Sequence, residues 1–235
     1  MSSVPRESLE TEVREFLVEL MPLEHAPAHL RLAFHDAGTY DEPTRSGGAH
    51  GTTRLPDELR RSENTGWGHA CMELLAEAKA RYPSLSWADL IAVGGAAAVQ
   101  KCGGPVICLG LGRTDLDAPA PVGRLPGGYE GAGLLRAGFV RLGLQPRDLV
   151  ALSGAHTLGH AQRQGFTRDP WVFSNSYFVE LLSGTSASLI LTDNALVRDP
   201  GLRQLVERYA QDEAQFFADF ADAFRRLTWL GNDAP

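Results

Sequence analysis

The stretch Asp148-Leu-Val-Ala-Leu-Ser-Gly-Ala-His156-Thr-Leu-Gly-His160 decides the fold of this chain. Its apolar residues recur at spacings that fit one face of a short buried helix. His156 follows that apolar run, where a neutral imidazole can bind a metal ion. The alternative is a histidine satisfied by hydrogen bonds in the core or at a helix end. The small residues at which a large flat ligand could approach the backbone are Ser153, Gly154 and Gly159.

A second stretch, Leu30-Arg-Leu-Ala-Phe-His-Asp-Ala-Gly-Thr-Tyr40, combines charge with an apolar surface. Arg31 and His35 are four residues apart and therefore share one face of a helix. The rest of that face is apolar. Burying a cation and a titratable base among apolar side chains with only a packing role would cost free energy. The pair indicates a functional site; the alternative is a surface arginine–carboxylate pair with a bystander histidine.

Both stretches, in this order, resemble the class I haem peroxidases, and ascorbate peroxidase most closely. The family's distal motif Arg-Leu-Ala-Trp-His-x-Ala-Gly-Thr corresponds to residues 31–39. Its proximal motif Ala-Leu-Ser-Gly-Gly-His-Thr-Leu-Gly corresponds to residues 151–159. The resemblance extends from about residue 9 to residue 231, and two long motifs in the right order are far more specific than one short pattern.

The resemblance implies a mainly α-helical, two-lobed haem peroxidase fold, with the haem between a distal and a proximal lobe. We expect residues 1–235 to form a single haem peroxidase domain. The distal lobe is expected at about residues 1–110, with the C-terminal helix packed against it, and the proximal lobe at about residues 125–230.

The resemblance also implies a reaction, the reduction of hydrogen peroxide to water by one-electron donors at one haem b per chain. His35 would act as base and then as acid toward the peroxide, and Arg31 would stabilise the developing charge. Asn64 matches the family residue whose amide oxygen orients the distal histidine; the alternative for Asn64 is a plain helix cap. Phe34 would form an apolar wall over the haem.

On the opposite side of the haem, the resemblance makes His156 the axial ligand of the iron, with Ser153 beside the cofactor. Residues 191–196 resemble the family's Ser-Asp-Lys-Ala-Leu segment. Asp193 is therefore expected to accept the free N–H of His156 and make the imidazole a stronger electron donor. The alternative is that Asp193 only caps the helical turn that follows.

Three features depart from the family near the haem. Phe34 replaces the distal Trp, which preserves an apolar wall but removes an indole donor. The segment after His156 is shortened, so that Trp171 is either the proximal haem Trp or a different residue. Thr157 remains from a proximal monovalent cation site, but Ser174 stands where an Asp is expected, which makes a bound cation doubtful.

The substrate site is only half recognisable. Arg163-Gln-Gly-Phe166 resembles the family's Arg-Ser-Gly-Phe, whose Arg binds ascorbate, and a planar guanidinium suits a planar anionic donor. A solvated side chain or a haem-propionate contact is the alternative for Arg163. His25 replaces a family Cys near the same edge, and a two-residue deletion could displace Arg163. The expected small reductant is ascorbate or a phenol.

The composition is that of an ordinary globular protein, with 43% hydrophobic and 22% charged residues. The net charge of −7 argues against nucleic acid and anionic membrane surfaces as partners. Three cysteines are too few for a disulfide framework, and no apolar run is long enough to span a bilayer. We expect a soluble intracellular monomer or homodimer, in the cytoplasm or an organelle stroma, including the chloroplast if a transit peptide is missing.

Helical periodicity and capping residues predict several helices. Phe216, Phe217, Phe220 and Phe224 form an aromatic stripe that we expect in the core rather than on a cofactor. The helices are expected at residues 7–20, at the segment around 31–35, and at 64–82, 86–102, 134–142, 145–155, 198–209 and 212–227.

Two alternatives to this function stay open. A related peroxidase could use a phenolic or a protein donor such as cytochrome c, and a protein donor would favour a proximal Trp. A non-catalytic haem sensor needs only the axial ligand, and retention of the whole distal and proximal set argues against it. Zinc is disfavoured because the pairs His25/His29 and His156/His160 lack a third ligand at suitable spacing.

Overall fold

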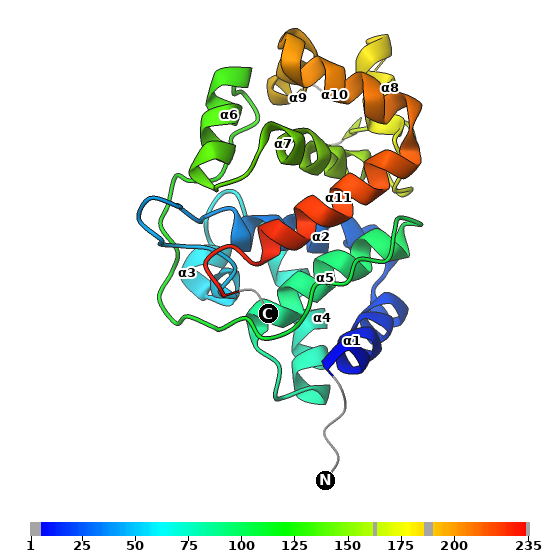
Figure 1. The fold of residues 1–235 in the computed structure, drawn as a ribbon. Coiled ribbons are helices and arrows are strands. Elements are labelled where there is room, and N and C mark those ends of the chain that lie inside the picture. Colours follow the sequence, from blue (N-terminus) through cyan, green and yellow to red (C-terminus); the bar gives the residue numbers. More distant parts are fainter. Residues whose placement is uncertain (1–5, 162–163, 186–189, 234–235) are drawn as a thin grey trace.

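The computed structural model describes residues 6–161, 164–185 and 190–233, and almost all regular structure in them is helical (Figure 1). Two short strands, β1 (His160–Ala161) and β2 (Gln164–Gly165), pair antiparallel with His160 opposite Gly165. Three 3₁₀ helices are η1 (Leu23–His25), η2 (Thr52–Arg54) and η3 (Gly154–Thr157). The α-helices are α1 (Arg6–Leu20), α2 (Ala26–Ala37), α3 (Pro56–Leu59), α4 (Gly68–Arg81), α5 (Trp87–Lys101), α6 (Ala132–Arg141), α7 (Pro146–Ser153), α8 (Ser176–Ser183), α9 (Leu191–Arg198), α10 (Pro200–Gln211) and α11 (Glu213–Thr228).

The helices gather into two groups. Figure 1 shows α1–α5 in the lower part of the view and α6–α10 in the upper part, with α11 crossing between them. α11 packs against α7 on one side and α2 on the other. The prediction of a mainly helical fold is confirmed, and the last helix joins the two groups. Within the described residues, no helix is both long and apolar enough to cross a membrane.

Small residues on α5 allow α2 and α11 to lie very close to it. A Cβ added at Gly95 would stand 2.7 Å from the Cβ of Ala33 and 2.7 Å from the Phe224 ring, both closer than normal contact. Side chains in protein interiors are packed as tightly as in organic crystals, so a larger residue here would separate the helices. The small face of α5 therefore serves helix packing and fixes the position of α2, which carries Arg31 and His35.

The end of α7 is fixed in the same way by α11. A Cβ at Gly154 would stand 2.4 Å from the Phe216 ring, so this glycine packs under α11 and does not face a ligand. The predicted aromatic stripe does contribute to the core, since Phe216, Phe220 and Phe224 are all at most 1% exposed. Close packing of α7 and α11 positions the 3₁₀ turn that follows α7, where His156 lies.

Two predicted helix boundaries were wrong. Asn64 does not cap a helix, because α4 begins four residues later at Gly68. The helix predicted at 198–209 is divided at Asp199, whose backbone is extended and whose carboxylate accepts the N–H groups of Gly201 and Leu202. Asp199 thus caps α10, and α9 ends just before it.

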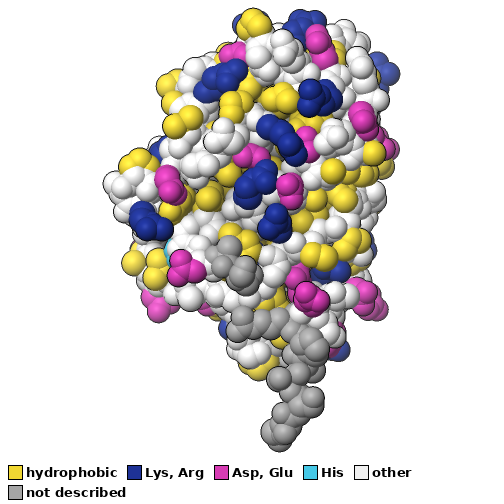
Figure 2. Space-filling view, in the orientation of Figure 1, with side chains coloured by type: hydrophobic (Ala, Val, Ile, Leu, Met, Phe, Trp, Pro, Cys, Tyr) yellow, Lys and Arg dark blue, Asp and Glu magenta, His cyan; other side chains and the backbone are white. Residues whose placement is uncertain are grey.

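Charged side chains also connect α7 to α11. Figure 2 shows Lys and Arg side chains interspersed with acidic ones across the middle of one face of the molecule. Arg147 of α7 pairs with Asp219 of α11, and Arg226 of α11 pairs with Asp148 of α7. Positive charges on these helices therefore have carboxylate partners and do not form a uniformly basic surface.

Candidate functional site

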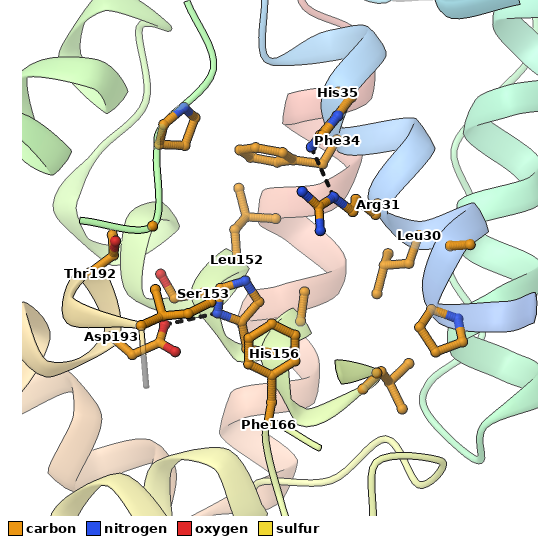
Figure 3. Close-up of a pocket in the computed structure, with 18 of the residues that line it drawn as sticks. Leu30, Arg31, Phe34, His35, Leu152, Ser153, His156, Phe166, Thr192 and Asp193 are labelled. Atoms are coloured by element: carbon orange, nitrogen blue, oxygen red, sulfur yellow. Dashed lines mark hydrogen bonds and ion pairs between the residues drawn. The ribbon is translucent and has the colours of Figure 1, made fainter. Parts of the chain in front are cut away.

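A cavity of about 410 Å³ opens between the two groups of helices, within the usual size of ligand sites. Its walls come from α2, α6, α7 and α11, together with Trp67, η3 and the segment that follows it, residues 126–128 and the start of α9. Figure 3 shows Arg31, Phe34 and His35 on one side of this cavity and His156, Phe166 and Asp193 on the other. Most of the lining is apolar, so the few polar groups are conspicuous.

The distal histidine is held by an amide. His35 Nδ1 lies 2.7 Å from Asn64 Oδ1, and Asn64 Nδ2 donates to the carbonyl of Glu58 at 2.9 Å. The second bond fixes which end of the Asn64 amide faces His35. Since an amide oxygen can only accept, Nδ1 must carry the proton, and Nε2 keeps its lone pair. The sequence-predicted residues Asn64 and His35 are therefore in contact.

His35 is a neutral base at ordinary pH. Burial, and then the nearby Arg31 cation, lower the pKa of His35 to about 4, against a smaller opposing effect of the bond to Asn64. His35 is only 6% exposed. Arg31 Nε donates to His35 Nε2 at 3.2 Å, which orders the two side chains with respect to each other. A base and a fixed cation thus lie together at the cavity wall.

Trp67 is a further residue on the distal side of the cavity that was not predicted from the sequence. The Arg31 guanidinium carbon lies 5.3 Å from the centre of its ring. The His35 ring meets the same indole edge to face at 5.3 Å between ring centres. Phe34 also lines the cavity, with its ring centre 6.2 Å from that of His35. The proximity of Trp67 to Asn64, three residues earlier in the same turn, was the available signal.

The proximal histidine is held by a carboxylate. His156 lies in η3, directly after α7, and its Nδ1 is 2.8 Å from Asp193 Oδ1. Asp193 is in the first turn of α9 and is 2% exposed, while 38% of the His156 side chain is exposed in the cavity. With the Nδ1 proton donated to Asp193, Nε2 carries the lone pair that could bind a metal. The predicted pair is brought together.

Tyr177, on α8, adds a second hydrogen bond to the same carboxylate oxygen. Its hydroxyl donates to Asp193 Oδ1 at 2.9 Å, and its ring meets that of His156 edge to face at 6.0 Å. Burial and the neighbouring Asp193 raise the pKa of Tyr177 well above its ordinary value, so the hydroxyl keeps its proton. Nothing in the local sequence predicts this contact, because it depends on α8 packing against α9.

Trp171 is not beside the proximal histidine, so that alternative was wrong. The ring stacked on His156 is Phe166, parallel to it with 4.4 Å between ring centres. Trp171 instead lies beside His160, at 5.2 Å, where it still lines the cavity. Phe166 directly follows β2, whose pairing with β1 brings it back toward His156, and it occupies the proximal position that was one alternative for Trp171.

Small side chains border the cavity near His156, where a flat ring could approach. Ser153 and Gly159 line the cavity, whereas Gly154 packs under α11. The Ser153 hydroxyl donates back to the carbonyl of Leu149 at 2.8 Å and is thereby satisfied without a ligand. Phe220 and Phe224 have two roles, since these core residues also form part of the cavity wall. The lining fits a large flat apolar cofactor.

Two expectations near the proximal turn have different outcomes. Arg163 lies outside the described residues. At the expected cation site, the hydroxyls of Thr157 and Ser174 each bond that of Ser176, at 3.1 and 3.0 Å. No group of three or more His, Cys, Asp or Glu side chains in the described part of the chain is placed to hold a metal ion.

Comparisons with known proteins agree with this geometry. The family profile described as Peroxidase matches residues 13–212. This chain belongs to the haem peroxidase family. Peroxidase enzymes of this family use a haem cofactor, which the apolar cavity with His156 at its wall fits.

The haem peroxidase is also similar to plant proteins named as ascorbate peroxidases. It is 46% identical to the probable L-ascorbate peroxidase 3, peroxisomal, of Oryza sativa subsp. japonica, over 89% of this chain and 75% of the relative. It is 47% identical to L-ascorbate peroxidase 5, peroxisomal, of Arabidopsis thaliana, over 89% and 77%. It is 45% identical to the cytosolic L-ascorbate peroxidase 1 of the same rice subspecies, over 88% and 86%. The predicted similarity to ascorbate peroxidase is confirmed.

Proposed function

We propose that this haem peroxidase reduces hydrogen peroxide to water with haem b as cofactor and ascorbate as electron donor, in the detoxification of peroxide. One observation supports this best. Two imidazoles line the same cavity from opposite sides, one bonded to an amide and the other to a carboxylate. A protein that only binds haem has no need for the first of these.

His156 is the residue that would hold the cofactor. Its Nε2 carries the lone pair, its side chain is exposed in the cavity, and small residues border it. When bound, haem supplies an iron that exchanges electrons with peroxide and with the donor. Asp193 would orient His156 and increase its electron donation. Phe34, Ser153 and Trp171 would line the cofactor space.

His35 would move the proton of the substrate. Its Nε2 accepts a proton from one peroxide oxygen and returns it to the other, which leaves as water. Asn64 keeps the Nδ1 proton in place, so only Nε2 takes part in the transfer. Arg31 stabilises negative charge on the oxygen that leaves, because its guanidinium is fixed beside Nε2 before the reaction begins.

Ascorbate is proposed as the donor because the similar plant proteins carry ascorbate in their names. Arg163 would bind it, as the resemblance of its segment implies. A phenol is the alternative small donor. A protein donor such as cytochrome c has less support, since the proximal position that would favour it holds Phe166 and not Trp171.

The remaining proposals concern organisation and location. A single peroxidase domain in two lobes agrees with the position of α11 between the two groups of helices. The relatives named above are called peroxisomal or cytosolic, and we propose one of these locations; the chloroplast expectation has no support from them. A proximal cation is not needed to explain the hydroxyl cluster of Thr157, Ser174 and Ser176.

The test is steady-state oxidation of ascorbate and of guaiacol by hydrogen peroxide, with haem-loaded protein. We expect turnover with both donors, faster with ascorbate, and loss of the ascorbate reaction alone in Arg163→Ala. Turnover of guaiacol without ascorbate would reject ascorbate as the donor. Bound haem with no turnover of either donor would favour a sensor.

A further inference from the structure

The oxygen that anchors the proximal histidine is shared. Asp193 Oδ1 accepts from His156 Nδ1 at 2.8 Å and from the Tyr177 hydroxyl at 2.9 Å. We propose that Tyr177 is a positioning residue that limits how strongly Asp193 attracts the Nδ1 proton of His156, and thereby limits electron donation from His156 to the iron. This inference rests on the proposed function, in which His156 binds haem.

The direction of the Tyr177 hydrogen bond is unambiguous. A carboxylate can only accept, so the phenol must donate its proton to Asp193. Tyr177 is 0% exposed and Asp193 is 2% exposed, so bulk water does not compete with this bond. Hydrogen bonds to a charged oxygen are strong, and they are stronger in a buried environment than in water.

Packing keeps the phenol in this position. The Tyr177 ring meets the His156 ring edge to face at 80°, and the ring of Phe178 at 5.0 Å and 75°. The fully buried ring thus packs against aromatic neighbours that limit its rotation and keep its hydroxyl directed at Asp193. A hydrogen bond held in this way acts on Asp193 continuously.

Sharing the oxygen weakens the bond to the histidine. Each donor neutralises part of the negative charge on Oδ1, so the phenol reduces the pull that the carboxylate exerts on the Nδ1 proton. Outer partners of a metal ligand tune the ligand's basicity, and with it the properties of the metal. Removing the phenol would make His156 more imidazolate-like and would stabilise the oxidised iron.

Tyr177→Phe tests this, because it removes the hydroxyl and retains the ring. The chain supplies a matched control in Tyr209→Phe. Tyr209 is also 0% exposed, and its hydroxyl donates at 2.7 Å to Asp219, a carboxylate that is 3% exposed. That bond joins α10 to α11 and does not involve His156. Both variants therefore lose a buried Tyr–Asp bond, but only Tyr177→Phe changes the partner of His156.

The readouts are the iron–histidine stretching frequency of the reduced haem-loaded protein and its midpoint reduction potential. We expect Tyr177→Phe to raise the frequency and lower the potential, while Tyr209→Phe leaves both at the wild-type values. In an Asp193→Asn background, the effect of Tyr177→Phe on both quantities should be smaller, because the amide oxygen that remains carries no full negative charge. An unchanged or lowered frequency in Tyr177→Phe, or equal shifts in both tyrosine variants, would overturn the inference.

A haem-free measurement separates this inference from the proposed function. In protein labelled with ¹⁵N-histidine, the Nδ1 proton resonance of His156 should move downfield in Tyr177→Phe and stay in place in Tyr209→Phe. Absence of an iron–histidine band in the wild type, together with the expected proton shift in Tyr177→Phe, would contradict the proposed function and leave the effect of Tyr177 on the His156 proton in place. A normal band in the wild type with no response of the band or the proton to Tyr177→Phe would contradict the inference alone.

Discussion

The two sides of the cavity present the same side chain, an imidazole, but bond it to different partners. On the distal side, His35 Nδ1 meets the amide oxygen of Asn64 at 2.7 Å. On the proximal side, His156 Nδ1 meets the carboxylate of Asp193 at 2.8 Å. Both bonds fix the ring and leave Nε2 with its lone pair. The distances are nearly equal, so geometry alone does not distinguish the two roles.

The charge of the acceptor distinguishes them. A neutral amide orients His35 without holding a positive charge, so burial and Arg31 keep its pKa at about 4 and the ring stays neutral. A carboxylate draws on the N–H proton and makes His156 a stronger donor at Nε2. One partner thus suits a base that must exchange protons, and the other a ligand that must donate electrons.

The largest expected effect is on the distal side. His35→Leu should slow the reaction with peroxide by roughly 10²–10⁴-fold, because it removes the group that moves the proton. The measurement is the second-order rate of the haem absorbance change after mixing with peroxide. His29→Leu, on the same helix but outside the cavity lining, is the control and should react at the wild-type rate. A normal rate in His35→Leu would remove the basis for its role.

The next largest effect is expected from a substitution that gives the proximal histidine an amide partner like that of the distal histidine. Asp193→Asn replaces the carboxylate by an amide, and loss of such an outer partner typically costs about 10–100-fold in affinity or activity. Haem affinity and peroxidase turnover should both fall, while Asp219→Asn, at the buried aspartate bonded to Tyr209, leaves them near wild type. Equal losses in both variants would show that only stability had changed.

The reverse exchange, Asn64→Asp, gives the distal histidine a carboxylate. The added negative charge should raise the pKa of His35 from about 4. Because only the neutral imidazole accepts a proton, the rate falls as the pH drops through that pKa, and the fall should begin at higher pH in the variant. The peroxide rate measured between about pH 4 and 8 would show this shift. Superimposable profiles would contradict the assignment of His35 as the base.

His29 extends the comparison to an imidazole with neither partner. It is 1% exposed, both ring nitrogens lack a hydrogen bond in the described structure, and burial lowers its pKa to about 4. Between about pH 6.5 and pH 4, the unfolded state therefore binds more protons at His29 than the folded state does. The contribution of His29 to the free energy of unfolding is therefore highest above the unfolded-state pKa. It decreases as the pH falls below that value, by at most about 1.4 kcal/mol per pH unit.

His29→Leu should remove that loss. Urea unfolding of haem-free protein should show a larger gain in stability over wild type at pH 5 than at pH 7.5. The same gain at both pH values would mean that His29 does not titrate differently in the folded and unfolded states.

The smallest expected effect concerns Trp67. A cation–π contact of about 0.5–1 kcal/mol corresponds to roughly two- to fivefold in rate, so Trp67→Leu should slow the peroxide reaction by that factor. Trp87→Leu is the control, since Trp87 has a similar contact with Lys79 at 5.8 Å, outside the cavity lining. Equal rates of the peroxide reaction in the two variants would show that Trp67 contributes only to packing.

In the pairs His35–Asn64 and His156–Asp193, the histidine was easier to predict from the sequence than its partner. His35 follows from its helical spacing to Arg31, because four residues make about one turn. Asn64 and Asp193 were found only through the family motifs, since their contacts join segments far apart in the chain. The structure brings all of them to the predicted positions, and their catalytic roles remain predictions.

Other features depended on packing that no local pattern reveals. Phe166 lies on His156 because it follows the paired strands β1 and β2, and Tyr177 reaches Asp193 because α8 packs against α9. The break at Asp199 could have been predicted, because a residue that precedes proline is biased away from helical backbone. Phe216, Phe220 and Phe224 are buried in the core as predicted, but Phe217 is only partly buried. Phe220 and Phe224 also line the cavity, so the expectation of a role in the core alone was wrong for these two.

The position of α11 has a consequence for the order in which the protein is made. Phe220, Phe224 and Leu227 form part of the cavity wall, and every other described wall residue precedes them in the chain. Chains are synthesised from the N-terminus, so a ribosome-bound intermediate that contains both histidines still lacks one wall. Cofactor capture should therefore follow synthesis of α11, and the nascent chain would carry His35 and His156 for a time with an open cavity between them.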